Sequence, residues 1–506
     1  MNWKAEGTAM NKNYLKYLFR ERKIALIFFL IVYAGICLTC FISYDKEYAV
    51  SSYLTSVRAG IIMSSMLAFA LPVLQLSYVH RRRSVDQYFA LPVSRKSQLV
   101  TEIAFMTAVC TGYLLVTSLI TYVIFAAHAV LFSVLLKILA VSCLFLLELI
   151  LVNSFFYLLA NNIFDGIVVI GAYTCLPLLL YLVIGAVVDT LIVGYTSAAG
   201  LDKFAWYLSP LVMGAKNTIN AVDQTSLDTG YLIAGIVWAL LACAGLKYQF
   251  IDRKTERAEQ LSDEFFAYRF IIHVYLAGIL LCMGCALWEE GLKTMVIYYL
   301  LLFVVYVIAH FVYKRKIELK ASYIAVYLAA ALAAAGITAA GWKTRGFGMA
   351  DRYELFTDKY LIYNYNADAF SDDLGKNIVM SENGYDWESA VSVSFELTVS
   401  EDEKEKYAEP VGIMEKLRKQ AIDDTYKMYG TPEDNRYLYN GWLSAMNAHN
   451  IHSNTDPWTN QFSYNVRSLL SEEELKLLSE YTDVTVYVNE TGEEYELPEY
   501  LEKRGG

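Results

Sequence analysis

The chain has 506 residues, of which 56% are hydrophobic and 19% charged, and its formal net charge is −10. Soluble globular proteins carry about 25% charged residues, so this composition excludes an ordinary soluble protein. The low counts of 8 Pro and 28 Gly exclude collagen-like and long disordered chains. The charge is uneven, because residues 343–506 hold 32 Asp and Glu against 16 Lys and Arg, whereas residues 1–342 carry +6. We therefore expect a basic membrane-embedded body followed by an acidic soluble region.

Nine apolar segments are long enough to cross a bilayer, which takes about 20 residues each. They are 24–43, 59–79, 99–127, 134–159, 166–188, 231–246, 270–288, 294–313 and 321–342. The predicted fold class is an all-α polytopic membrane bundle of about nine transmembrane helices, plus a C-terminal extracellular α+β domain.

Lys and Arg gather in alternate loops of this arrangement. With the N-terminus inside, 20 of them fall in the inner segments and five in the outer loops. The inner segments are 1–23, 80–98, 160–165, 247–269 and 314–320. This bias predicts a cytoplasmic N-terminus, and nine spans then place residues 343–506 outside the cell. Residues 1–23 are polar and basic without a cleavage site, so the first span is expected to be an uncleaved anchor.

These features divide the chain into four predicted parts. The first is a cytosolic interfacial helix, because one face would hold Tyr14, Leu15, Leu18 and Phe19. A plain basic flank of the first span is the alternative reading. The parts are the interfacial helix at 1–23, a six-span core at 24–250 with an inner loop at 80–98 and an outer loop at 189–230, three additional spans at 251–342, and the acidic domain at 343–506.

The inner loop 80–98 is the most informative one and reads HRRRSVDQYFALPVSRKSQ. The preference of Lys and Arg for the cytoplasmic side of a membrane explains its three consecutive arginines by itself. It does not explain the segment 86–91, which predicts a short helix with aromatic residues on one side, stopped by Pro92. Such a helix at the cytoplasmic face is typical of docking to a soluble partner.

The stretch DQYFALPVSR at 86–95, between the second and third spans, resembles the coupling loop of type-two ABC exporter permeases. The resemblance also covers the interfacial helix, the six leading spans and an outer loop that contains Leu-Ser-Pro at 208–210, roughly residues 10–250 in all. The last three spans and the acidic domain depart from the minimal six-span permease. They resemble the extended permeases of Gram-positive antimicrobial-peptide and cell-envelope exporters.

This resemblance implies a permease subunit in the bacterial cytoplasmic membrane that exports an amphiphilic substrate, either an antimicrobial peptide, a lipid or a cell-envelope compound. It implies as partners cytosolic ABC ATPase subunits, which would hold ATP and Mg, a second permease that is identical or homologous, and membrane lipids. The chain has no GxxxxGK[ST] loop, so we expect no enzyme activity and no cofactor in it. The implied coupling residues are Arg81, Arg82, Arg83, Asp86, Tyr88, Phe89, Leu91, Pro92 and Arg95.

Polar side chains inside predicted spans are rare and costly, so each one is a candidate functional residue. They are Glu102, Lys137, Glu148 and Asn153. Glu148 lies near the middle of its span, where it either forms hydrogen bonds between helices or lines a path.

The outer loop contains an apolar run at 201–213 that is broken at Pro210 and too short to cross. It predicts re-entrant or interfacial helices, and a loop lying on the membrane is the alternative. The resemblance implies that this element closes the outer mouth of the path, with Trp206, Ser209 and Pro210 as gate residues.

The acidic domain has clear local signals. Alternation at 390–398 and the run 483–488 predict strands. The patterns Ser400-x-x-Glu403 and Ser471-x-x-Glu474 are capping boxes that predict helix starts.

Catalytic and metal sites are not supported in this domain. His449 and His452 lack further ligands at motif spacing, and the acidic run of Asp368, Asp372 and Asp373 lacks the pattern of a calcium loop. We therefore expect no metal. Its negative charge excludes nucleic acid. The charge leaves three roles, which are solubility, the attraction of cationic peptides and the repulsion of anionic wall polymers.

A receptor is the rival class of function. In that reading the chain does not transport, and its ectodomain binds a peptide or envelope ligand and signals through the spans. An ATPase gene beside this one favours export, and a sensor kinase gene alone favours reception. An ion-driven transporter ranks third, because the spans show neither a pair of broken helices nor an acidic relay.

Overall fold

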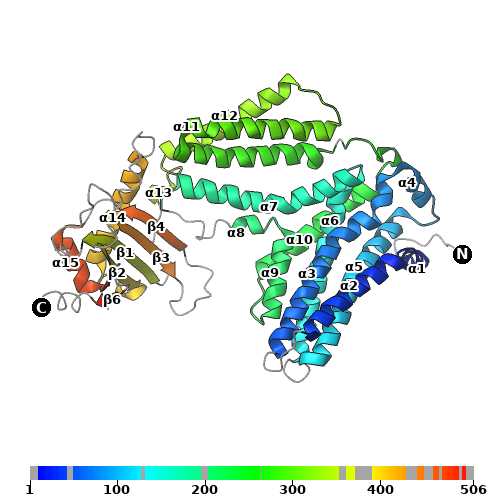
Figure 1. Ribbon diagram of the computed structural model, residues 1–506, viewed down its shortest axis with the longest axis horizontal. Coiled ribbons are helices and arrows are strands. Elements are labelled where there is room, and N and C mark those ends of the chain that lie inside the picture. The colour runs from blue at the N-terminus through cyan, green and yellow to red at the C-terminus, as the bar shows by residue number, and fades with distance from the viewer. Residues whose placement is uncertain are drawn as a thin grey trace. The chain divides into compact units, whose positions relative to one another are not determined.

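The structure is a computed structural model (Figure 1). It describes residues 10–42, 49–126, 131–194, 203–262, 264–352, 360–370, 390–428, 441–448, 460–466, 470–488 and 493–496. Contacts divide the chain into two compact units. Unit 1 comprises Met1–Leu178, Ala205–Tyr275 and Ile308–Ile317, and unit 2 comprises Leu179–Phe204, Leu276–Val307 and Glu318–Gly506.

Helices account for most of the described chain up to residue 352. The α-helices are α1 (Lys12–Glu21), α2 (Lys23–Ile42), α3 (Ala49–Gln75), α4 (Arg82–Phe89), α5 (Arg95–Thr121), α6 (Phe132–Leu158), α7 (Ile163–Leu191), α8 (Lys203–Trp206), α9 (Pro210–Val222), α10 (Thr229–Leu246), α11 (Phe270–Lys314), α12 (Ala321–Lys343) and α13 (Met349–Arg352). Short 3-10 or π-helical segments are η1 (Ser77–His80), η2 (Tyr122–Ala126), η4 (Lys247–Ile251), η5 (Thr255–Arg257) and η6 (Phe265–Arg269).

Among the described residues, eight helical segments are long and apolar enough to cross a membrane. They are Val50–Gln75, Arg95–Ile124, Phe132–Leu158, Ile163–Leu191, Thr229–Ile251, Phe265–Leu287, Lys293–Lys314 and Ala321–Lys343. The chain is therefore a multi-pass membrane protein with an all-α bundle.

These eight correspond to the second to ninth predicted spans. The first predicted span, 24–43, coincides with α2, of which Lys23–Leu38 counts as a shorter apolar helix. The second differs most from its prediction of 59–79, because α3 begins ten residues earlier, at Ala49. Backbone hydrogen bonding carries the helix through polar residues such as Ser51, which the apolar run alone does not include.

The segment assigned as α11 holds two of the spans, and they run antiparallel. The rings of Tyr268 and Tyr313 lie 5.1 Å apart, and those of His273 and His310 lie 6.0 Å apart. Residues so far apart in sequence meet only if the chain reverses between them. The reversal falls between Leu287 and Lys293, where one span ends and the next begins.

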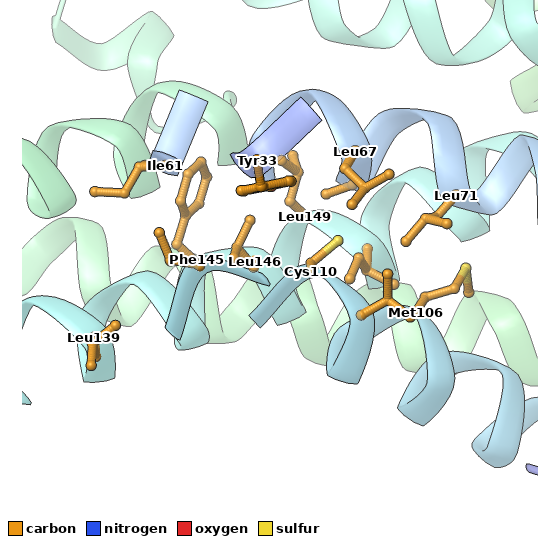
Figure 2. Close-up of a cluster of buried hydrophobic side chains, with 14 of the residues drawn as sticks. Tyr33, Ile61, Leu67, Leu71, Met106, Cys110, Leu139, Phe145, Leu146 and Leu149 are labelled. Carbon is orange, nitrogen blue, oxygen red and sulfur yellow. The ribbon is translucent and has the colours of Figure 1, made fainter. Parts of the chain in front are cut away.

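Unit 1 has an apolar core where α2, α3, α5 and α6 meet (Figure 2). Figure 2 shows side chains from all four helices turned toward one another. Those labelled are Tyr33, Ile61, Leu67, Leu71, Met106, Cys110, Leu139, Phe145, Leu146 and Leu149. Side chains on the opposite faces, Ile62 and Leu136 among them, are exposed, as expected for helices that contact lipid.

The C-terminal part of unit 2 is an α+β domain with one antiparallel sheet. Its strands are β1 (Tyr360–Phe370), β2 (Ala390–Ser400), β3 (Gly441–Ala448), β4 (Asn460–Val466), β5 (Asp483–Val488) and β6 (Glu493–Glu496), in the order β4-β3-β1-β2-β5-β6. The helices α14 (Ala408–Met428) and α15 (Glu472–Tyr481) and the 3-10 turn η7 (Glu401–Glu403) complete it.

One face of this sheet packs on α14. Phe395, Leu397 and Val399 alternate along β2 and are buried together with Met414 and Leu417 of the helix. The same core takes in Val188 and Ile192 at the end of α7. The domain is thus packed directly onto that helix end within unit 2.

Three local predictions for this domain are confirmed, and one is wrong in detail. The alternation at 390–398 lies in β2. The strand at 483–488 is β5, and Ser471 and Glu474 form the capping box of α15. Ser400 and Glu403 do not open an α-helix. They bound the 3-10 turn η7, in which the Ser400 hydroxyl donates to Glu403, and α14 begins only at Ala408.

Candidate functional site

The predicted inner loop folds as a short helix, α4, between α3 and α5. It ends with a turn at Ala90, because Pro92 lacks a backbone N–H and restricts the residue before it. Ser94 then caps α5, its hydroxyl accepting from the Ser97 amide at 3.3 Å. The helix and its flanks lie with α1 and with residues 251–262 at one end of unit 1, which we call the basic end.

The inner face of α4 is aromatic and rests on its neighbours. Tyr88 stacks on Tyr78 with ring centroids 4.1 Å apart, and Phe89 meets Phe250 edge to face at 5.8 Å. The Tyr88 hydroxyl donates to the carboxylate of Glu21, the last residue of α1, at 3.0 Å. The inner face therefore contacts α1, η1 and η4.

Arg95, the first residue of α5, ties this helix to the segment after α10. Its guanidinium lies 4.3 Å from the ring centre of Phe89 and donates to the carbonyls of Ile251, at 3.1 Å, and Arg253, at 2.7 Å. Arg82 adds a bond from Nε to the Ala258 carbonyl at 3.2 Å. Both ends of α4 are thus attached to residues 251–258.

Arg253 is buried at 2% exposure and joins this segment to the turn between α6 and α7. It donates to the carbonyls of Leu158 and Ala160 and to Asn161 Oδ1, at 2.9, 3.2 and 2.8 Å. Burial lowers the pKa of Arg253 to about 10, so it keeps its charge at neutral pH. Burial and this charge hold the pKa of His80 well below its ordinary value, so that imidazole is neutral.

A second buried network connects α1 with α5. The Tyr14 hydroxyl donates to Glu102 Oε1 at 2.5 Å, and Gln98 donates to Tyr78 at 2.9 Å. Burial, and then the neighbouring carboxylate of Glu102, raise the pKa of Tyr14 far above its ordinary value, so the phenol stays a donor. The Asn11 amide reaches Thr101 Oγ1 at 3.0 Å. The interfacial helix is thus attached to α5 by buried hydrogen bonds.

The nine predicted coupling residues fall into two groups. Five are exposed on the outer face or flanks of α4: Arg81, Arg82, Arg83, Asp86 and Pro92. Four are half-buried against the protein: Tyr88, Phe89, Leu91 and Arg95. Sequence reasoning missed Tyr14, Tyr78, Gln98 and Arg253 as members of this site. Arg253 was visible only as one more positive charge in an inner segment, and no motif marks the others.

The remaining intramembrane polar residues lie elsewhere in unit 1. Asn153 donates to the Ala68 carbonyl at 3.3 Å, and Lys137 donates to the Thr225 carbonyl at 3.3 Å. Glu148 is 6% exposed and lines a cavity between α6, α9 and α10. Only Glu102 belongs to the basic end.

The three predicted gate residues flank the start of α9. Ser209 caps this helix, its hydroxyl accepting from the Val212 amide at 3.3 Å, and Pro210 is the first helical residue, where its missing N–H costs nothing. Trp206 ends α8. With 13 residues, α9 is too short to cross a bilayer, and it packs alongside α6 and α10.

Within the described part of the chain, no group of three His, Cys, Asp or Glu side chains is placed to hold a metal. His449, His452, Asp372 and Asp373 lie outside the described residues, and Asp368 lies in β1 with its side chain not described. The chain matches no protein-family model, no curated protein and no solved structure. Its function must therefore be inferred from the geometry of the basic end.

Proposed function

We propose that this chain is the permease subunit of an ATP-driven ABC exporter in a bacterial cytoplasmic membrane, with its basic end in the cytosol and its acidic domain outside. In this proposal a separate ATPase subunit docks on α4, and a second permease, identical or homologous, completes the path. The substrate is an amphiphile: an antimicrobial peptide, a lipid or a cell-envelope compound.

One observation carries the proposal: α4 has an exposed polar face and an inner face attached to several helices. Arg83, Asp86 and Gln87 are exposed side chains on a helix of eight residues. A partner that pushes on this face acts on a short rigid element and not on a loose loop. This is what docking by a soluble motor subunit requires.

The inner contacts supply routes for the motion. Tyr88 leads to α1 through Glu21, and Arg95 is itself the first residue of α5. From Arg95 the hydrogen bonds run to the backbone of Arg253 and from its side chain to the turn between α6 and α7. A displacement of α4 therefore reaches α1 and α5 directly, and it reaches the end of α6 and the turn before α7 through Arg253. This suits a change in access along a path between these helices.

Co-purification tests the docking role. We expect Asp86→Arg to reduce recovery of a Walker-type ATPase with the tagged full-length chain at least tenfold, because a charge reversal on an interface opposes association. Glu318→Arg makes the same chemical change at another exposed position and should recover the ATPase as wild type does. Equal recovery with both variants, or wild type purified without any ATPase, would overturn the proposal and favour the receptor.

Transmission is tested separately with Tyr88→Phe, which removes only the hydroxyl that bonds Glu21. The ATPase should still co-purify, whereas its stimulation by substrate should fall. A variant that loses the ATPase altogether would assign Tyr88 to docking and contradict the division between the two faces of α4.

A further inference from the structure

Unit 1 contains a cavity of about 200 Å³ between α6, α9 and α10, away from the basic end. Its walls are almost entirely apolar. The lining side chains that are themselves exposed are Leu144, Ile236, Leu240 and Cys243, so the cavity opens on an apolar surface of the kind that contacts lipid. Pockets that hold drug-sized ligands measure about 300–1,000 Å³, so this one takes one end of a longer molecule.

A single carboxyl group lies in this cavity. Glu148 is 94% buried, and its Oε1 accepts no hydrogen bond from any described residue. Among the described side chains no Lys or Arg forms an ion pair with it. Burying a carboxylate without a partner is costly. A cationic ligand that binds here would therefore form a hydrogen bond with an oxygen that no described residue occupies.

The facing helix leaves room for the carboxyl group. A Cβ atom on Gly235 of α10 would lie 2.6 Å from Glu148 Oε2, a distance that real side chains do not tolerate. The absence of that atom lets α10 pass close to α6 without displacing the carboxyl from the cavity.

The side-chain amide of Asn217, which also lines the cavity, is already engaged. Asn217 donates through Nδ2 to the Asp228 carbonyl at 3.1 Å, and its Oδ1 accepts from the Asp228 amide at 2.8 Å. A metal ion needs several oxygen ligands, and one carboxylate does not provide them. A primary ammonium group can form a charge-assisted hydrogen bond with one carboxylate and can carry an alkyl chain that contacts the apolar walls.

We propose that this cavity binds the ammonium end of an amphiphilic amine that enters from the bilayer, with Glu148 as its counter-ion and Gly235 as the residue that makes room for the carboxylate. The proposal goes beyond ATP-driven export, because binding of this kind needs no ATPase. It deepens that function only if the bound amine is also the exported molecule.

Binding to the full-length chain in lipid nanodiscs, without ATPase, tests this proposal. The probe is a twelve-carbon chain with a dansyl amide at one end and a primary ammonium at the other. The control probe is identical except that a hydroxyl replaces the ammonium. Energy transfer from tryptophan to dansyl reports probe binding. The part of this signal that excess unlabelled dodecylamine removes is the saturable binding. We expect Glu148→Gln to weaken ammonium binding about tenfold and hydroxyl binding less than twofold.

Two further variants keep the test decisive. Ser142→Ala, on α6 but outside the cavity lining, should bind as wild type does. Gly235→Ala retains the carboxylate but crowds it, so it should also weaken ammonium binding, and it carries the test if Glu148→Gln does not fold. The proposal is overturned by equal binding of the two probes, by unchanged binding in both variants, or by no saturable binding to wild type, as a second copy covering the cavity would produce. None of these results bears on the docking of an ATPase at α4.

Discussion

The basic end of unit 1 and the C-terminal domain of unit 2 use polar residues in opposite ways. At the basic end, Arg253 and Glu102 are buried, and their partners come from residues about 90 positions away. In the domain, the core is apolar, and the pair of Lys416 with Glu474 lies at the surface. Buried hydrogen bonds between distant segments fix the relative positions of helices, whereas exposed pairs add little to a fold that apolar packing already defines.

Among its described residues the domain also has a buried arginine, Arg418. Arg418 is 5% exposed, but its partner Glu415 is one turn away on the same helix, at 2.8 Å. Its ion pair stays within one helix, and its side chain also interacts with Tyr464 of β4. Arg253, by contrast, joins three segments of unit 1. The difference between the regions is therefore in what each polar contact connects, and three substitutions measure it.

The largest effect is expected for Arg253→Met. The apolar chain of Met fills part of the space but leaves the acceptors of Leu158, Ala160 and Asn161 without a donor. Unsatisfied buried acceptors and the loss of charged hydrogen bonds predict a destabilisation of about 3 kcal/mol. Thermal unfolding of the purified chain in detergent measures it. Lys254→Met, at the neighbouring exposed position, should stay within about 0.5 kcal/mol of wild type. Equal effects of the two would show that Arg253 is not a structural link.

A smaller effect is expected for Tyr14→Phe. This variant removes only the hydroxyl that donates to Glu102 and leaves that buried carboxyl short of a partner, at a cost of about 2 kcal/mol. Unfolding of Tyr14→Phe, Glu102→Gln and the double variant completes a cycle, in which the two changes should not add.

Tyr248→Phe is the control for this cycle, since Tyr248 is an exposed tyrosine whose hydroxyl should not matter. Additive losses would mean that the short contact between Tyr14 and Glu102 contributes nothing to stability. They would also remove the basis for regarding α1 as attached to α5 by this network.

The apolar spans were predictable from sequence because each one is a continuous run of apolar residues. The spans at 132–158 and 321–343 differ from their predictions, 134–159 and 321–342, by two residues at most. Helix ends outside the apolar layer were less predictable, as at α3, because backbone hydrogen bonding continues there without a hydrophobic signal.

The members of the candidate site were harder to predict than the helices. The proline-stopped segment 86–91 indicated α4 as an element, but not which of its faces is exposed. Glu102 and Glu148 carried the same sequence signal, since both are carboxyls in apolar spans. Only the fold distinguishes them: Tyr14, 88 residues earlier, bonds the first, and no described residue bonds the second.

The smallest effect is expected in the domain, for Glu474→Gln. Lys416 donates to Glu474 at 2.5 Å, and this contact, followed by the bond from Ser471, lowers the pKa of the carboxyl below its ordinary value of 4.5. A lowered folded pKa stabilises the fold above pH 4.5, and this stabilisation is lost as pH falls through the folded pKa. Because the pair lies at the surface, it contributes about 0.5 kcal/mol.

Glutamine keeps the capping acceptor of α15, so this variant isolates the charge. Hydrogen exchange of α15, compared between wild type and Glu474→Gln at each pH, should be about twofold slower in wild type at pH 7 and equal in the two at pH 3. Glu473→Gln, at the exposed neighbouring position, should match wild type throughout. A loss in Glu474→Gln as large as in Arg253→Met would mean that exposed and buried polar contacts have the same weight in this protein, and the contrast between its two regions would not hold.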